Sequence, residues 1–226
     1  MINSEILNIG VSSHHLYYEK TKNVLHKSLL TAGVPESSIY YFVADPDVPL
    51  GDYSWDDENV CRIGHNSFDM NAYVSVVEQN LKSKRWFFTH DTTFVGPNFY
   101  NILLNYDYDG KDVVTLMPSH SYGPMWIGSY SWNALEQLKP LIVSSYKNQS
   151  FDKSTSNSFK SFLVKMEGKT EVYMKTPHYY SQREIRGVST EYYGCSTPRL
   201  LEYFSGLDLY KTKANWFDKS NWTVQP

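Results

Sequence analysis

The residues of this chain best suited to do chemistry follow a short apolar run, residues 86–88 (WFF). They are residues 89–93 (THDTT), in which a carboxylate lies between imidazole and hydroxyl groups. Three large apolar residues bounded by turn signals predict a buried strand, and ligands of open α/β sheets collect at the carboxyl ends of strands. This pattern favours a ligand or metal site at the strand end. The alternative is an aspartate that only caps the next turn.

Two earlier apolar runs end in polar residues in the same way. Residues 6–11 lead into Ser12, Ser13 and two histidines, and residues 39–43 lead into Asp45-Pro46-Asp47. The carboxyl ends of parallel strands meet at one edge of a sheet. We therefore expect these polar groups to converge with residues 89–93. The alternative for Asp45 is the start of a turn, because Asp-Pro favours turns.

Helical spacing of apolar residues alternates with these runs. It predicts helices over residues 16–32, 66–81 and 98–105, and a further strand over residues 60–63 after a loop at 46–58. Asn66 and Asp69 have the spacing of a capping box, although Asp replaces Glu, and Pro97 suits a first helical turn.

The later part of the chain is less regular. Strands are predicted at residues 113–117 and 125–127, a turn at 128–131 with Ser131 as the N-cap, and a helix at 132–139 that ends at Pro140. Residues 147–157 form a polar loop. We expect a helix near residues 158–166, a strand near 171–175, and a helix over 198–205 that ends at Gly206.

Strands that alternate with helices predict an α/β fold. We expect a mostly parallel, Rossmann-like central sheet flanked by helices on both faces. The length of 226 residues suits a single domain with one core. There is no G-x-G-x-x-G after the first strand and no G-x-x-x-x-G-K-[ST], so a dinucleotide fingerprint and a P-loop are both disfavoured.

The charge of the chain is unevenly distributed. The net charge is −3, which argues against general nucleic-acid binding. Residues 1–138 hold 8 Lys and Arg against 16 Asp and Glu, whereas residues 139–226 hold 13 against 8. The second part could face an anion such as a diphosphate, or could simply carry a solvated basic surface. The 19 Tyr, 11 Phe and 6 Trp suit a core, and also surfaces that stack on sugars or bases.

Cysteine usage and the N-terminal residues suggest a cellular location. Cys61 and Cys195 are the only cysteines and lie far apart in sequence, so we expect two reduced thiols. The first residues carry no basic lead followed by a long apolar run, and no apolar stretch approaches the length of a membrane span. The sequence therefore predicts a cytoplasmic protein without a transmembrane segment.

The order of these elements resembles that of the nucleotide-sugar glycosyltransferases with the GT-A fold. In that family a helix precedes the strand that ends in an Asp-x-Asp motif, and residues 71–96 (NAYVSVVEQNLKSKRWFFTHDTTFVG) look like this block. Residues 125–138 (MWIGSYSWNALEQL) look like the strand, turn and helix on the acceptor side. The resemblance implies a nucleotide-binding half over residues 1–105 and an acceptor-side half over residues 106–226.

The resemblance also implies roles for the strand-end residues. Where the family shows Asp-x-Asp, this chain has Thr89-His90-Asp91, so it keeps one acidic position. Asp91 then corresponds to the position that binds Mn²⁺ or Mg²⁺, and His90 to a further metal ligand or a ribose contact. Asp45 is implied as a base or ribose contact, and Ser12 and Ser13 as neighbours of the nucleobase.

The chemistry of sugar transfer explains the need for a cation. The bond from the sugar to its diphosphate breaks, and the leaving group gathers negative charge. A divalent cation with hard oxygen ligands can share that charge, and phosphate oxygens can fill most of its coordination sphere. Lys or Arg from the basic second part could supplement or replace the metal. Lys211, Lys213 and Arg199 are the candidates, and the alternative for each is an ordinary surface charge.

An inverting transfer also needs a general base beside the acceptor hydroxyl, normally Asp or Glu. Glu191 lies in a segment bounded by glycines, which looks like the acidic base loop of the family. His120, on the loop after residues 113–117, is the rival. The alternative for both is a loop polar group that is hydrogen-bonded locally.

The resemblance, taken with these observations, implies a hexosyltransferase. The expected reaction moves a sugar from a nucleoside-diphosphate sugar, such as a UDP-sugar, to a glycan or another hydroxyl acceptor, with metal assistance and inversion. Two other functions compete with it. One is a non-catalytic carbohydrate-binding or interaction module that uses the tyrosine-rich surface, and the other is a nucleotidyltransferase on a similar sheet.

Overall fold

A computed structural model describes residues 7–67, 70–109, 112–115, 127–146, 190–192, 201–204 and 206–212. Its main sheet consists of β1 (Leu7–His14), β2 (Ile39–Ala44), β3 (Tyr53–Trp55), β4 (Val60–Ile63), β5 (Arg85–His90), β7 (Val113–Thr115) and β8 (Gly128–Ser131). The strand order is β3-β4-β2-β1-β5-β8-β7. The chain therefore crosses over repeatedly, as an α/β fold requires.

The centre of this sheet is parallel. β4, β2, β1 and β5 run in one direction, whereas β3 and β8 run against their neighbours. The register places Ser12 opposite His90 and His14 opposite Ala44, so the ends of three strands share one edge. The predicted mostly parallel sheet is confirmed, and so is the expected convergence of the strand ends.

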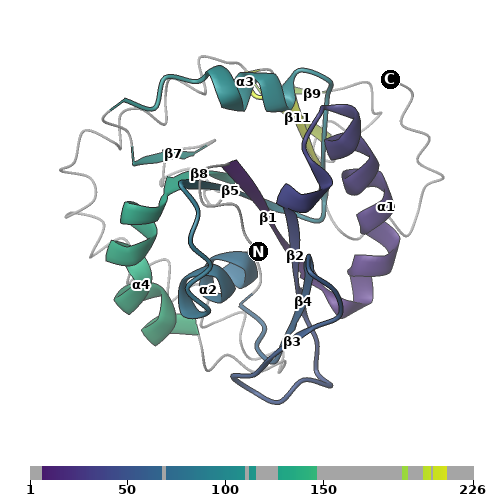
Figure 1. The fold of residues 1–226 in the computed structure, drawn as a ribbon. Helices are drawn as coiled ribbons and strands as arrows, with labels where there is room; N and C mark the ends of the chain where they lie inside the picture. The colour runs from purple at the N-terminus through teal and green to yellow at the C-terminus, as the bar shows by residue number, and fades with distance from the viewer. Residues whose placement is uncertain are drawn as a thin grey trace.

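Helices cover both faces of the sheet (Figure 1). α1 (His15–Thr31) lies on one face, and α2 (Asn71–Glu78) and α4 (Trp132–Tyr146) lie together on the other. α3 (Phe99–Asn105) packs on the α1 side, where Phe99 and Leu103 join the cluster that contains Leu25 and Leu29. The α/β architecture predicted from the alternating pattern is confirmed.

β5 carries apolar side chains on both faces because helices cover both faces of the sheet around it. Trp86 and Phe88 face α2, Phe87 faces α1, and all three are fully buried. Gly10 is paired with Phe88 on the neighbouring strand β1, and a Cβ atom at Gly10 would lie 2.8 Å from the Phe88 ring. The absence of a side chain at residue 10 therefore makes room for the aromatic ring.

A second sheet begins immediately beyond Asp91. It contains β6 (Thr93–Val95), β9 (Thr190–Tyr192), β10 (Leu201–Phe204) and β11 (Leu209–Thr212), in the order β6-β11-β10-β9 and with every pairing antiparallel. β11 thus brings the distant C-terminal part of the chain alongside the end of β5.

Asp208 ties this second sheet to α3. Its carbonyl accepts a hydrogen bond from Gly96 N at 2.7 Å, and its carboxylate accepts one from Asn98 N, at the start of α3, at 3.0 Å. A Cβ atom at Gly96 would overlap that carboxylate. Gly96 is therefore required for the close approach of the two segments.

Several predicted elements were wrong in kind or in extent. Residues 201–204 form strand β10, although an amphipathic helix was predicted, and residues 128–131 form strand β8 where a turn was predicted. Residues 53–55 form β3 within the predicted loop. α2 begins at Asn71, five residues late, with Met70 as an N-cap that makes no side-chain cap. Asn66 therefore does not cap α2, and Asp69 lies outside the described residues.

α4 continues through Pro140, where the sequence predicted its end. Ala134 and Leu135 before the proline are buried, and Val143 after it packs against the same cluster beside α2. Burial on both sides of Pro140 favours a continuous helix despite the missing N–H donor. The predicted N-cap is confirmed, because Ser131 Oγ accepts a hydrogen bond from Ala134 N at 3.1 Å.

None of the helices in the described part of the chain is long and apolar enough to cross a membrane. The elements predicted at residues 147–157, 158–166 and 171–175 lie outside the described residues.

Candidate functional site

Asp91 is held against the end of β1 by two hydrogen bonds. Its backbone N–H donates to Ser12 O at 3.1 Å, and its carboxylate accepts a hydrogen bond from Ser13 Oγ at 2.6 Å. Asp91 is 7% exposed. The structure therefore brings together three of the sequence-predicted site residues, at the edge where the parallel strands end.

The same strand end fixes the start of α2. Ser12 Oγ accepts a hydrogen bond from Ala72 N at 3.0 Å, and Asn71 Nδ2 donates to Ser13 O at 2.9 Å. Orphan amides at the start of a helix need such acceptors. The hydroxyl of Ser12 thus has a capping role, and its predicted contact with a nucleobase stays a prediction.

Asp45 lies one strand away and is bound by an arginine. Its carboxylate accepts hydrogen bonds from Arg62 Nη1 at 2.7 Å and from Asp47 N at 3.0 Å. Burial alone would raise the pKa of Asp45, but these two hydrogen bonds and the guanidinium charge hold it below its usual value. Asp45 is therefore ionised, and it starts the turn that its Asp-Pro sequence predicted. Its role in binding base or ribose stays a prediction.

His14, the last residue of β1, and His15, the first residue of α1, lie side by side, with ring centroids 4.3 Å apart. His14 caps α1, because its Nδ1 atom accepts a hydrogen bond from Leu16 N at 3.2 Å. Burial and then the neighbouring His15 lower the pKa of His14 from 6.5 to about 4, against a raising effect of Asp45. His14 is thus neutral near pH 7, as the capping hydrogen bond requires.

This arrangement predicts a pH-dependent loss of stability that His14→Asn should reduce. The unfolded state binds the His14 proton below about pH 6.5 and the folded state only below about pH 4, so stability falls as pH drops through that window. Asparagine does not titrate there and remains a good N-cap. Urea unfolding at about pH 7 and about pH 4.5 should show a smaller difference for His14→Asn than for the natural chain. Equal differences would contradict the assignment.

Lys211 from β11 lies at the end of β5. Its Nζ atom is 3.2 Å from His90 Nδ1 and 3.4 Å from Thr92 Oγ1. β11 pairs with β6 so that Lys211 lies opposite Thr93. Of the three cations that the sequence singled out, Lys211 is thus placed against His90 and Thr92, the residues on either side of Asp91 in the chain, whereas Lys213 and Arg199 lie outside the described residues.

The threonines on either side hold the turn that carries Asp91. Thr89 Oγ1 and Thr93 Oγ1 are 2.8 Å apart, and Thr93 Oγ1 also donates to His90 O at 2.7 Å. Both threonines are buried. Their hydroxyl groups therefore stabilise the turn, which places the carboxylate of Asp91 and the ring of His90.

The described residues offer a divalent metal few protein ligands. Among them, no three His, Cys, Asp or Glu side chains are grouped so that they could hold a metal ion. Asp91 already accepts a hydrogen bond from Ser13, and an ammonium group lies 3.2 Å from His90 Nδ1. A positive charge beside a metal ligand repels the metal. Binding of Mn²⁺ or Mg²⁺ by Asp91 and His90 stays a prediction.

The two candidate bases are placed only in part. Glu191 lies on β9, opposite Tyr203 of β10, and strands β10 and β11 separate it from β6. With strands spaced about 4.8 Å apart, its backbone is roughly 14 Å from β6. His120 lies outside the described residues. Both assignments stay predictions.

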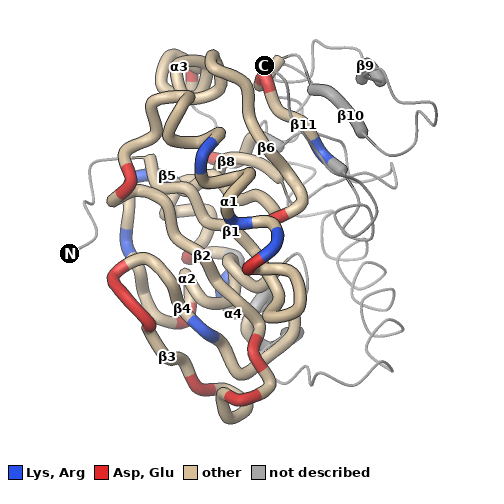
Figure 2. Tube along the Cα trace, turned by 90° about the vertical axis from the view of Figure 1, so that its right-hand side faces the viewer, with Lys and Arg blue, Asp and Glu red and all other residues tan. Residues whose placement is uncertain are grey.

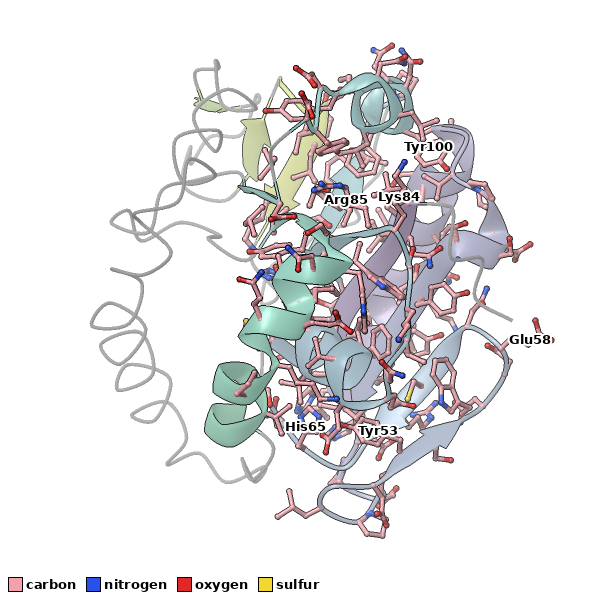
Figure 3. All side chains as sticks on the ribbon, turned by 60° about the vertical axis from the view of Figure 1, so that its left-hand side comes forward. Tyr53, Glu58, His65, Lys84, Arg85 and Tyr100 are labelled. Carbon is pink, nitrogen blue, oxygen red and sulfur yellow. The ribbon has the colours of Figure 1, made fainter. Side chains whose placement is uncertain are left out.

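Sequence reasoning missed a polar group after β4. His65 is fully buried with its Nδ1 atom 2.9 Å from Ser67 Oγ, and its ring lies 6.0 Å from that of Tyr53. Figure 3 shows His65 and Tyr53 together near one end of the sheet, away from Lys84 and Arg85 at the start of β5. The signal was residues 64–67 (GHNS), the same pattern of polar residues directly after an apolar strand.

A cleft of about 440 Å³ opens along α1, away from the carboxyl ends of the strands. It lies between α1 and the first residues of β2 and β4, and its lining includes Tyr18, His26, Tyr41 and Asn59. Acidic segments gather near it, around β3 and β4 (Figure 2). The cleft does not include Ser12, Asp45 or Asp91, so the strand-end group is a separate feature.

Comparisons with known proteins concern the fold. No family model matches the sequence, and no curated protein matches it. The apo form of the glycosyltransferase GlyE from Streptococcus pneumoniae TIGR4 aligns with a TM-score of 0.38 and 9% identity, over 75% of this chain and 40% of its own. A glycosyltransferase involved in glycosylation of the major capsid of PBCV-1 aligns with a TM-score of 0.33 and 13% identity, over 60% of this chain and 65% of its own. This chain spans less than two thirds of the length of either protein.

Proposed function

We propose that this chain is a glycosyltransferase that uses a nucleoside-diphosphate sugar as donor and a hydroxyl group as acceptor. The observation that carries the proposal is the hydrogen bond that holds Asp91 to Ser13 at the end of β5, next to His90, whose ring is contacted by Lys211. Asp91 lies where an open α/β sheet binds ligands, and α2 precedes β5 as a helix precedes the motif strand in the family that the sequence resembles.

The reaction needs a leaving group that is stabilised and an acceptor that is activated. The bond between the anomeric carbon and the diphosphate oxygen breaks, and the diphosphate leaves with the electron pair. The acceptor oxygen forms the new bond and loses its proton to a base, for which Glu191 is the first candidate. Asp91, held by Ser13, accepts hydrogen bonds from hydroxyl groups of the donor. A cation, either a divalent metal or a basic side chain, stabilises the diphosphate.

A donor panel tests the proposal. The protein is incubated with UDP, GDP and TDP and with their sugar derivatives, and thermal unfolding and nucleotide products are measured. Binding at about 100 times the dissociation constant should raise the free energy of unfolding by about 2.7 kcal/mol. We expect a stabilising nucleoside diphosphate and the release of that diphosphate from its sugar derivative.

The same panel separates the competing functions. No stabilisation by any nucleotide, with or without Mn²⁺, would contradict the proposal and favour a carbohydrate-binding module. Release of pyrophosphate from a nucleoside triphosphate would instead favour a nucleotidyltransferase.

A further inference from the structure

We propose that the cleft along α1 binds a small ligand with protonated amines, of the polyamine class. Its volume of about 440 Å³ falls within the usual range for small-molecule sites. The lining comes from α1, from the segments that lead into β2 and β4, and from the first residues of those two strands, and it includes no described residue that we assign to sugar transfer. The inference is therefore independent of the proposed function.

A buried tyrosine presents an unpartnered hydroxyl group at this cleft. Tyr18 of α1 lines the cleft and is only 6% exposed. Its ring packs edge-on against that of Tyr41 at 5.5 Å, but its hydroxyl group makes no hydrogen bond to any residue that the structure describes. Burial, and then the charges of Glu19 and Asp57, raise the pKa of Tyr18 to about 12, so the group stays protonated. Its oxygen can accept a hydrogen bond from a ligand.

The rim of the cleft carries two carboxylates that no basic side chain neutralises. These rim carboxylates, Asp57 and Glu58, are exposed, and neither is in a salt bridge within the described ranges of the chain. Asp57 Oδ1 is fixed by hydrogen bonds from Asn59 N at 2.7 Å and Val60 N at 2.8 Å. Figure 2 shows acidic segments around β3 and β4. A cleft lined by one sign of charge concentrates ligands of the opposite sign.

The basic side chains that line the cleft are engaged with other groups. Lys22 Nζ is 2.9 Å from Glu19 Oε2 and lies over the ring of Tyr18, 4.7 Å from its centroid. His26 Nε2 is 3.6 Å from Glu36 Oε1. Neither contact involves the rim carboxylates, whose charge is thus left for a ligand. The place of Lys22 also shows that an ammonium group fits against this aromatic surface.

The combination of an acidic rim and apolar side chains favours a polyamine. Protonated amines donate charge-assisted hydrogen bonds to carboxylates, whereas a neutral sugar would bring no counter-charge to the rim. Ile39 and Val60 also line the cleft, and methylene segments between the amines can pack against them. A basic protein segment would meet the same carboxylates, but the volume of the cleft suits a small ligand.

The test is calorimetric titration of the protein with spermidine. We expect the natural chain to bind spermidine at a single site, and Asp57→Asn/Glu58→Gln to bind it at least about tenfold more weakly. Tyr18→Phe, which removes the hydroxyl group alone, should weaken binding by a factor of about three or more. Asp109→Asn/Glu136→Gln removes two exposed carboxylates elsewhere, and as the matched control it should bind as the natural chain does.

Several results would overturn the inference. No spermidine binding by the natural chain would exclude the site, and full affinity in Tyr18→Phe would place the ligand elsewhere. Equal weakening in the two double variants would show only a general attraction to an acidic protein. Binding of a lysine-rich peptide without binding of spermidine would make a basic protein segment the occupant. Unfolding of each variant without ligand shows whether a loss of affinity reflects a loss of fold.

Discussion

Asp91→Asn is expected to lower kcat/KM for sugar transfer by a factor of about 100 or more, with little change in stability. A factor of about 100 corresponds to roughly 2.7 kcal/mol of lost transition-state stabilisation, the size expected when a charged group that accepts hydrogen bonds from the donor is neutralised. Asparagine keeps the size of the side chain, and its Oδ1 atom can still accept the hydrogen bond that Ser13 Oγ makes to Asp91 at 2.6 Å. The charge alone is lost.

The measurement is the initial rate of nucleoside diphosphate release, beside thermal unfolding of the same samples. Asp52→Asn, which neutralises an exposed carboxylate outside the strand-end group, is the matched control and should keep full activity. If Asp91→Asn retains activity within a factor of about three, Asp91 is not at the reacting centre. The carboxylate would then serve only to join β5 to β1.

The core of the fold was predictable because local pattern and tertiary burial agree there. Residues 86–88 are apolar without alternation, which only a strand buried on both faces tolerates, and β5 has that environment. Residues 60–63 were predicted with the observed bounds of β4. The convergence of Ser13 with Asp91 followed from the rule that parallel strands end at one edge, without any knowledge of side-chain geometry.

The second sheet was not predictable in this way, because distant pairing decides its strands. Residues 201–204 carry apolar residues at helical spacing, yet they pair with β11 on one side and β9 on the other. Lys211 lies 121 residues from His90, so the sequence could name it only as one basic residue among several. The position of Lys211 thus depends on the second sheet, whose strands are decided by distant pairing and not by local sequence patterns.

Trp86→Ala is expected to lower the free energy of unfolding by about 3–5 kcal/mol, the range for truncating a large buried aromatic. Trp86 is fully buried and packs edge-on against Tyr40 and Phe42, with ring centroids 5.3 Å and 6.4 Å away. It also stacks on Phe88 at 5.9 Å, and its Nε1 atom donates to Leu81 O at 3.1 Å. Truncation leaves both a cavity and an unsatisfied carbonyl group.

The loss is a large part of the roughly 5–15 kcal/mol that typically stabilises a domain. The free energy of unfolding of Trp86→Ala is therefore measured at low temperature, where a folded baseline persists in low urea. Trp55→Ala is the matched control: Trp55 is 37% exposed and donates a hydrogen bond to Gln79 Oε1 at 3.0 Å, so its truncation should cost about 1 kcal/mol or less. Urea unfolding followed by circular dichroism gives both values. Equal losses in the two variants would show that β5 is not the centre of the core, and Asp91 would then lack the rigid strand on which the proposed site depends.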